Sequence, residues 1–322
     1  MNRRDGIRAA LALALNGLSL PSVRAQAFPS RPLRLVVAFA PGGAGDILAR
    51  LVAKKLAEGL GQPVVVENRP VPVAAVTAVQ QAKPDGYTLL MAGSGTALTS
   101  ALYAKLPYDL MKDFIHLSTL SSFDLVLVNG AESPFRSVAE LVAFAKAQPG
   151  KLNIATARVG STQNLTAEMF KAQAGINAVI VPFKTTVDLV GALRSQEVHV
   201  AFEMVPALLG QIHGKVVRAL GVTAPERNPV LPTVPTLEEA GLKDFESASW
   251  NGLAVPAGTP PDVVERLARG IQRVVDSPEV QAQYRTLGYT GGGSTPEAMR
   301  KRMQADITKW SAVIQKAGIP LQ

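Results

Sequence analysis

The sequence LRLVVAFAPGGAGDILAR, residues 33–50, is typical of a buried strand, a glycine-rich turn and an amphipathic helix in succession. Leu35–Phe39 is a short apolar run of the kind found in parallel sheets covered on both faces. Pro41 ends this strand, and Gly42 and Gly43 allow the backbone to approach a ligand closely. We therefore expect the first amides of the helix to point, unpaired, into the space above the carboxyl end of the strand. Such amides form an anion site.

The same turn could instead be a plain connection between a strand and a helix, because one glycine-rich turn is a weak indication of ligand binding. The sequence excludes two nucleotide-binding versions of it. Leu48 stands where a dinucleotide fingerprint requires its third glycine, and no Gly-Lys-Ser or Gly-Lys-Thr follows as a P-loop would require. Asp46 falls in the first turn of the helix, where a carboxylate can cap the helix or face a ligand; we favour the cap.

Composition limits the classes of protein to consider. The 322 residues, 47% of them apolar and 18% charged, suit one large or two modest globular domains. The formal charge is +8, of which +3 lies before residue 28, and no basic run or aromatic-interleaved patch indicates nucleic-acid binding. The absence of cysteine excludes disulfides, a lipoprotein anchor and thiol chemistry, so the core must provide the stability. We expect no cofactor.

Residues 1–27 are predicted to be a signal peptide. Arg3-Arg4 supplies a positive start, Ala9–Leu20 is a short apolar segment, and Ala25-Gln26-Ala27 has the small residues of a cleavage site. Val23-Arg24-Ala25 is a second candidate for cleavage. The apolar segment is shorter than the roughly 20 residues that span a bilayer, and no later stretch approaches that length. We expect export to the periplasm, by the general secretory or the twin-arginine route, and no membrane insertion of the mature chain.

The remaining chain alternates predicted strands with predicted helices, which indicates doubly wound, mostly parallel sheets. The predicted strands are 64–67, 87–91, 115–128, 152–156, 179–181, 198–202, 217–222 and 250–255. The predicted helices are 74–82, 137–148, 162–174, 187–195, 206–213, 260–275 and a last one ending near 316. Capping boxes at Ser137, Thr236 and Ser294 support three helix starts.

Two crossings, near residues 125 and 248, divide the mature chain into two α/β lobes with the second inserted into the first. The first lobe is expected to comprise 28–124 and 249–322, and the second 125–248. Ligands of such folds bind at the carboxyl ends of strands and between lobes. Three loops rich in Gly, Ser and Thr collect there, and they are 40–46, 92–96 and 157–164.

The sequence contains no recognisable catalytic set. The three histidines form no metal-binding spacing, and Ser94 and Ser161 lack the flanking glycines of a nucleophile elbow. Two charged residues leave alternatives open. Glu203 could face the cleft or cap the helix that begins near Pro206, and Lys184 could pair with an anionic ligand or lie in solvent.

Short motifs recur along the whole mature chain. They are Phe28–Val37, Pro41–Asp46, Gln62–Pro70, Pro84–Leu90, Leu106–Asp109, Gly160–Thr162, Leu231–Thr236 and Pro256–Pro260. In combination they resemble the solute-binding receptors of the tripartite tricarboxylate transporter (Bug) family. The resemblance implies a periplasmic binding protein of the type II class, a monomer that closes on a small carboxylate and delivers it to transporter subunits in the membrane.

In the family, backbone amides and hydroxyls of three loops hold the carboxylate, partly through water. The matching residues here are Pro41, Gly42, Gly43, Ser94, Gly95, Ser161 and Thr162. Neighbouring residues complete the candidate ligand-binding set, and they are Asp46, Thr96, Gly160, Asn164, Phe183, Lys184 and Glu203. No metal ligand and no catalytic residue is expected among them.

The sequence departs from the family pattern at four places near this site. Val71–Ala75 replaces a glycine-rich turn, Phe183–Thr186 replaces Tyr-Lys-Gly-Gly, Asn164 replaces a histidine and Glu203 replaces an aspartate. We expect a retained carboxylate site with an altered distal end. Two other functions stay open: a ligand sensor without a dedicated transporter, and an enzyme on the same fold, for which the sequence offers no partnered nucleophile or base.

Overall fold

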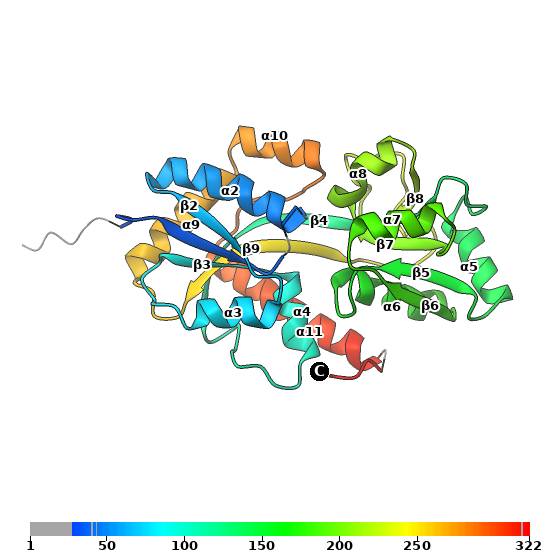
Figure 1. Cartoon of the computed structure of the whole chain (residues 1–322), viewed down its shortest axis with the longest axis horizontal. Coiled ribbons are helices and arrows are strands. Elements are labelled where there is room, and N and C mark those ends of the chain that lie inside the picture. Colours follow the sequence, from blue (N-terminus) through cyan, green and yellow to red (C-terminus); the bar gives the residue numbers. More distant parts are fainter. Residues whose placement is uncertain (1–27, 40, 43, 317) are drawn as a thin grey trace, which may run out of the picture.

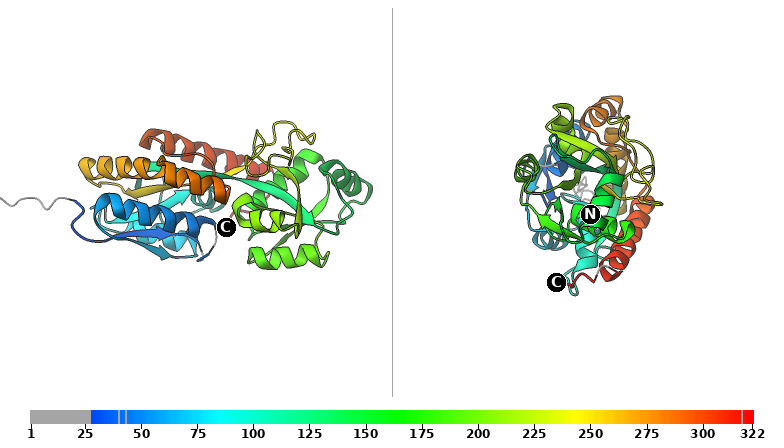
Figure 2. Two further views of the ribbon diagram at one scale, coloured as in Figure 1. Left: turned by 90° about the horizontal axis from the view of Figure 1, so that it is seen from above. Right: turned by 90° about the vertical axis from the view of Figure 1, so that its right-hand side faces the viewer.

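A computed structural model describes residues 28–322 except 40, 43 and 317, and it shows two α/β lobes joined by long strands (Figures 1 and 2). The predicted signal peptide, 1–27, and Gly43 lie outside the described residues. One sheet path runs through both lobes in the order β2-β1-β3-β9-β4-β7-β5-β6, and β8 pairs with β4 beside this path.

The first lobe is built on three parallel strands, β1 (Leu33–Val37), β2 (Val64–Asn68) and β3 (Thr88–Gly93). Leu35 packs with α2 (Ala44–Leu60) and α9 (Pro261–Val275) on one face, whereas Val36 packs with α3 (Pro72–Gln80) and α11 (Pro296–Lys316) on the other. Successive side chains of a strand alternate between faces, so a strand covered on both faces is apolar throughout. Two further helices, α4 (Ser94–Leu102) and α10 (Pro278–Leu287), complete this lobe.

The second lobe repeats this arrangement. Its parallel strands are β5 (Leu152–Thr156), β6 (Ala178–Pro182) and β7 (Val200–Met204), with β8 (Val217–Val222) beyond β4. Helices α5 (Val138–Ala147) and α6 (Thr162–Ala174) pack on one face of the sheet. Helices α7 (Thr186–Arg194) and α8 (Val205–His213) pack on the other face.

Two long antiparallel strands connect the lobes, β4 (Phe114–Gly130) and β9 (Ala248–Pro256). β4 pairs with β9 as far as Asp124 and with β7 and β8 from Leu125 and Val126 onward. β4 runs from the first lobe to the second. β3 is antiparallel to β9, which is antiparallel to β4, so β3 and its parallel neighbour β1 also point toward the second lobe. β7 is directly antiparallel to β4, so β7 and the parallel strands β5 and β6 point toward the first lobe. The carboxyl ends of both sets of strands therefore face the space between the lobes.

This architecture confirms the expected two-lobe α/β fold and most of its elements, with differences that have physical reasons. β4 and β9 run antiparallel to their neighbours, so each lobe has a mixed sheet around a parallel part. The small-residue segment 92–96 is not a loop, because β3 passes directly into α4. α10 was not predicted. The capping-box hydrogen bonds of Thr236 and Glu239 form, but the residues that follow make only a turn.

Candidate functional site

In the glycine-rich turn after β1, a carboxylate of the protein itself accepts a hydrogen bond from one of the turn's amides. Oδ2 of Asp46 accepts hydrogen bonds from the Gly42 amide and from Arg50 Nε, both at 2.9 Å. Asn68 Nδ2 donates to Oδ1 at 2.8 Å. Burial raises the pKa of Asp46, but the hydrogen bonds from Arg50, Gly42 and Asn68 outweigh it and hold that pKa below its ordinary value. The Gly42 amide is thus paired, and Asp46 acts as a cap.

The second expected loop is the first turn of α4, and its hydroxyls join that helix to β9 and α11. The fully buried Ser94 accepts a hydrogen bond from the Trp250 amide and donates one to Asp306 Oδ2, both at 3.2 Å. Thr96 Oγ1 donates to the Gly93 carbonyl at 2.8 Å and accepts from the Gly93 amide at 2.9 Å. These hydroxyls already have partners. Gly95, which has no side chain, is the member of this turn whose backbone a ligand can approach.

The third loop, between β5 and α6, keeps unpaired donors. Ser161 Oγ caps the helix by accepting from the Asn164 amide at 3.1 Å, and Asn164 Oδ1 accepts from the Gly160 amide at 3.1 Å. Thr162 is only 4% exposed, yet its hydroxyl has no hydrogen-bond partner within the described part of the chain. The amides of Thr162 and Gln163 also lack an acceptor there. This turn can therefore donate to an anion.

Glu203 lies at the end of β7 and connects the first turns of two helices. Its Oε1 accepts from Gln163 Nε2 of α6 at 2.6 Å and from the Met204 amide at 2.8 Å. Its Oε2 accepts from Thr186 Oγ1 of α7 at 3.1 Å. Burial raises the pKa of this 4%-exposed carboxyl, and the three donors offset only part of that effect. Both oxygens are thus engaged by the protein.

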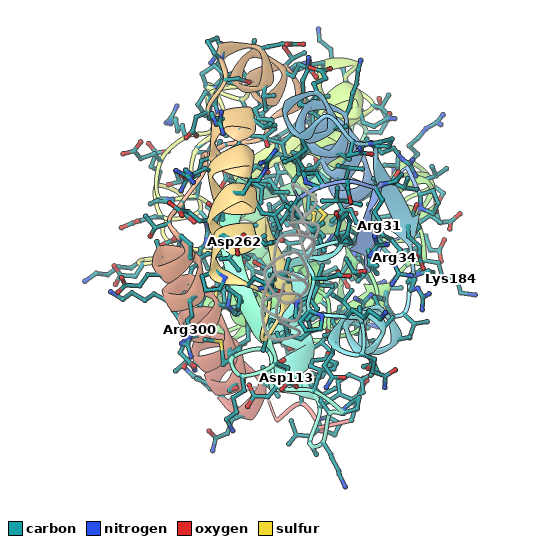
Figure 3. The ribbon with its side chains drawn as sticks, turned by 90° about the vertical axis from the view of Figure 1, so that its left-hand side faces the viewer. Arg31, Arg34, Asp113, Lys184, Asp262 and Arg300 are labelled. Atoms are coloured by element: carbon teal, nitrogen blue, oxygen red, sulfur yellow. The ribbon has the colours of Figure 1, made fainter. Side chains whose placement is uncertain are left out.

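The remaining candidates lie at the edges of this region. Phe183 is half-buried against the α7–α8 cluster, and its amide donates to the Thr156 carbonyl at 2.8 Å. Lys184 is exposed, and its side chain points outward from the molecule (Figure 3). Pro41 and Gly42 are exposed at the start of α2. The structure therefore brings Thr162, Asn164 and Glu203 together, but it leaves Lys184 apart from them.

Sequence reasoning missed a group on α11 that holds the start of α4 and the two long strands in place. Asp306 Oδ2 accepts from Trp250 Nε1 at 2.7 Å as well as from Ser94. Arg302 lies over the Trp250 ring, 4.8 Å from its centroid, and donates to Ser122 Oγ at 2.9 Å. No local pattern in α11 could have indicated these contacts, because they depend on how the last helix packs on both long strands.

Within 28–322, apart from the three gaps, no His, Asp or Glu side chains gather in a set of three or more that could ligate a metal. The helices of that same part include none long and apolar enough to cross a membrane.

These features define a two-lobe α/β binding protein whose parallel strands end facing the other lobe, with unpaired backbone donors at the start of α6. The family model for the tripartite tricarboxylate transporter family receptor, TctC, matches residues 48–319, and the chain belongs to this family. Protein BugT of Bordetella pertussis is 32% identical over 318 residues, covering 96% of each chain.

Two solved structures with ligands are similar throughout. Rpa4515 of R. palustris with adipate is 32% identical with a TM-score of 0.84, covering 91% of this chain and 99% of that one. MatC (Rpa3494) of Rhodopseudomonas palustris with bound malate is 31% identical with a TM-score of 0.79, covering 89% and 100%.

Proposed function

We propose that this chain is an exported, monomeric receptor that captures a small carboxylate between its lobes and delivers it to a tripartite tricarboxylate-type transporter. The observation that carries the proposal is the first turn of α6. There the amides of Thr162 and Gln163 and a nearly buried Thr162 hydroxyl lack protein acceptors, at a strand end that faces the other lobe. The adipate and malate held by the two structural relatives are ligands of the same chemical class.

The donors suit a carboxylate because hydrogen bonds to a charged acceptor are stronger than neutral ones. Each such bond contributes on the order of 1.5–3 kcal/mol. The positive end of a helix adds a smaller favourable effect. From the first lobe, the ligand would contact the backbone of Gly95. The Gly42 amide already donates to Asp46, so this turn could bind the ligand only through a neighbouring amide or after Asp46 moves away.

We place the lobe boundaries at 124/125 and 248/249, with 28–124 and 249–322 in the first lobe. The change of partner along β4 after Asp124 and the start of β9 at Ala248 support this division. Closure of the lobes would then bend β4 and β9 near these positions and bury the ligand. The proposal also includes removal of residues 1–27 near Ala27, a periplasmic location and release of the ligand unchanged.

The test is thermal unfolding of the purified protein with mono-, di- and tricarboxylates and amino acids. A ligand at about 100 times its dissociation constant stabilises by roughly 2.7 kcal/mol, a shift of a few degrees. Thr162→Val keeps the shape of the side chain and removes a hydroxyl without a protein partner, so it should weaken binding with little change in stability. Thr308→Val is the control for the same substitution away from the site, at an exposed position of α11 whose hydroxyl donates to the Gln304 carbonyl.

Three outcomes would contradict the proposal. The absence of a shift with every carboxylate would exclude the ligand class, and an unchanged affinity in Thr162→Val would exclude that hydroxyl from the site. Turnover of a bound carboxylate by the purified protein would indicate an enzyme instead of a receptor.

A further inference from the structure

Arg158 stands in the turn between β5 and α6 and belongs to none of the contacts described above. It follows the last residue of β5 by two positions, and its carbonyl accepts from the Ser161 amide at 3.0 Å. Asn164 braces the same turn, because its Oδ1 accepts from the Gly160 amide and its Nδ2 donates to Thr156 Oγ1 at 3.5 Å. The backbone of Arg158 is therefore held in place beside the unpaired amides of α6.

This turn lies against the first lobe. Gly160 has a φ of +72°, and a Cβ at this residue would lie 2.5 Å from Leu102 Cδ2 at the end of α4. Leu165 of α6 packs in one cluster with Leu98 and Leu102 of α4. The residue after Leu102, Tyr103, is near enough to act electrostatically on Arg158. The guanidinium is thus carried on a turn between the lobes, on the side where α4 and α6 meet.

The charge of Arg158 has no counter-ion within the part of the chain that the structure describes. No ion pair or hydrogen bond there engages its guanidinium, and the residue is exposed on the turn between β5 and α6. Other basic groups near the cleft differ. Arg50 is paired with Asp46, Lys184 points outward, and Arg302 lies on Trp250 and donates to Ser122. An exposed guanidinium without a protein partner, on the turn that also carries the unpaired amides of α6, is free to pair with an anion that comes from outside.

We propose that Arg158 binds the second carboxylate of a dicarboxylate whose first carboxylate is held by the amides of α6, so that this receptor prefers dicarboxylates to monocarboxylates with the same chain. This inference rests on the proposed function and adds a residue that selects among carboxylates. The planar guanidinium can donate two parallel hydrogen bonds to one carboxylate, which gives both strength and a defined orientation.

The alternative is that apolar side chains, instead of Arg158, contact the end of the ligand far from the α6 amides. Four exposed aliphatic side chains follow the carboxyl ends of β1, β2, β5 and β6, and they are Ile47, Val71, Val159 and Val187. If they contact the ligand and Arg158 does not, a monocarboxylate with an apolar tail would bind at least as tightly as the dicarboxylate.

The experiment measures dissociation constants calorimetrically for matched pairs, namely adipate with hexanoate, succinate with butyrate, and terephthalate with benzoate. The wild-type protein, Arg158→Gln and Arg158→Lys are compared at two salt concentrations. In the wild type, at least one dicarboxylate should bind roughly tenfold or more tightly than its partner, from the strength of one charge-assisted contact. Arg158→Gln should abolish this preference and reduce its salt dependence, and Arg158→Lys should keep part of it.

The monocarboxylate provides the internal control, because its affinity should be the same in wild type and Arg158→Gln if the variant is folded. Equal binding of both members of every pair by the wild type, or a preference that survives in Arg158→Gln, would overturn the role of Arg158 and leave the proposed function intact. Failure of every carboxylate to bind the wild type would overturn both.

Discussion

Asp46 accepts a hydrogen bond from the Gly42 amide at 2.9 Å, so one amide donor of the glycine-rich turn is paired with a carboxylate of the chain itself. Arg50 and Asn68 hold that carboxylate from the other side. The turn that first suggests an anion site is therefore the one whose identified amide donor is already satisfied. At the start of α6 in the second lobe, the amides of Thr162 and Gln163 have no acceptor within the described part of the chain.

Replacing Asp46 tests this capping role. Asp46→Ala leaves the Gly42 amide and Arg50 without their acceptor, and we expect a loss of about 1–3 kcal/mol in the free energy of unfolding, measured with urea. Glu265→Ala, which removes an exposed ion pair with Arg269, should cost no more than about 0.5 kcal/mol. Equal small effects of both substitutions would contradict the structural role of Asp46.

The difference in unfolding free energy between the wild type and Asp46→Ala should depend on pH. Because the pKa of Asp46 is lower in the folded chain than its ordinary value of 3.8, its stabilising effect is complete above that value. The effect is lost as the pH falls through the folded pKa. The stability difference between wild type and Asp46→Ala should therefore shrink in acid and stay constant near neutrality.

Glu203 gives a second test, in which the direction of the effect decides between two roles. In Glu203→Gln the carbonyl oxygen can still accept from Gln163 and Met204, and the amide nitrogen can donate to the Thr186 hydroxyl in place of accepting from it, so the first turns of α6 and α7 stay joined. At a pH where Glu203 is ionised, removing this buried negative charge near the amides of α6 should tighten carboxylate binding, by roughly three- to tenfold because a short-range Coulomb repulsion is lost. Calorimetry with the ligand found in the thermal test measures this. Weaker binding in Glu203→Gln would instead mean that the carboxylate contacts the ligand directly.

Substitutions of Gly93 and Gly95, at the start of α4, distinguish an effect on stability from an effect on ligand binding. A Cβ on Gly93 would overlap the carbonyl oxygen of Trp250, so Gly93→Ala should destabilise the protein by about 1–3 kcal/mol in urea unfolding. No atom lies within 4 Å of a Cβ on Gly95, so Gly95→Ala should fold as well as the wild type or better by up to about 1 kcal/mol. If a ligand approaches the Gly95 backbone, Gly95→Ala should weaken binding nevertheless, and unchanged binding would remove this turn from the site.

How much of this was predictable depends on how local each cause is. β5 and β8 have the predicted bounds because each is a mainly apolar run bounded by turn residues, and Ser137 caps α5 as its capping box predicts. α4 was missed because Ser94–Leu102 is rich in Gly, Ser and Thr, which favour loops in isolation. It is helical because Ala97, Leu98 and Leu102 are buried against neighbouring elements, and tertiary packing of that kind outweighs intrinsic propensity.

The site follows the same rule. The three loops could be placed at strand ends from the order of strands and helices alone, because that order sets which edge of a sheet they share. The hydrogen-bond partners of each side chain could not be predicted, because they lie far away in the sequence. Ser94 donates to Asp306, and Glu203 accepts from both Gln163 and Thr186. Contacts between distant residues have no local pattern, and they determine which donors stay unpaired.

Asp124 provides a last test at the junction of the lobes. It is the last residue of β4 paired with β9, and its Oδ2 accepts from Asn228 Nδ2 at 2.8 Å. Burial raises the pKa of Asp124, the hydrogen bond from Asn228 lowers it, and the nearby charge of Glu246 raises it further, so that the pKa lies above its ordinary value of 3.8. For a carboxyl whose folded pKa is raised, the ionised form destabilises the fold, and this cost develops as the pH rises from 3.8 through the folded pKa.

Asp124→Asn retains an acceptor for Asn228 and removes the charge, so its melting temperature should exceed that of the wild type near neutral pH. The gain should vanish below pH 3.8, where the wild-type carboxyl is protonated in both the folded and unfolded states. Asp262→Asn, at an exposed acid in the first turn of α9, is the control and should show no such gain. A lower melting temperature for Asp124→Asn near neutrality would show that the charge at this junction is favourably paired, and that the strands between the lobes depend on it.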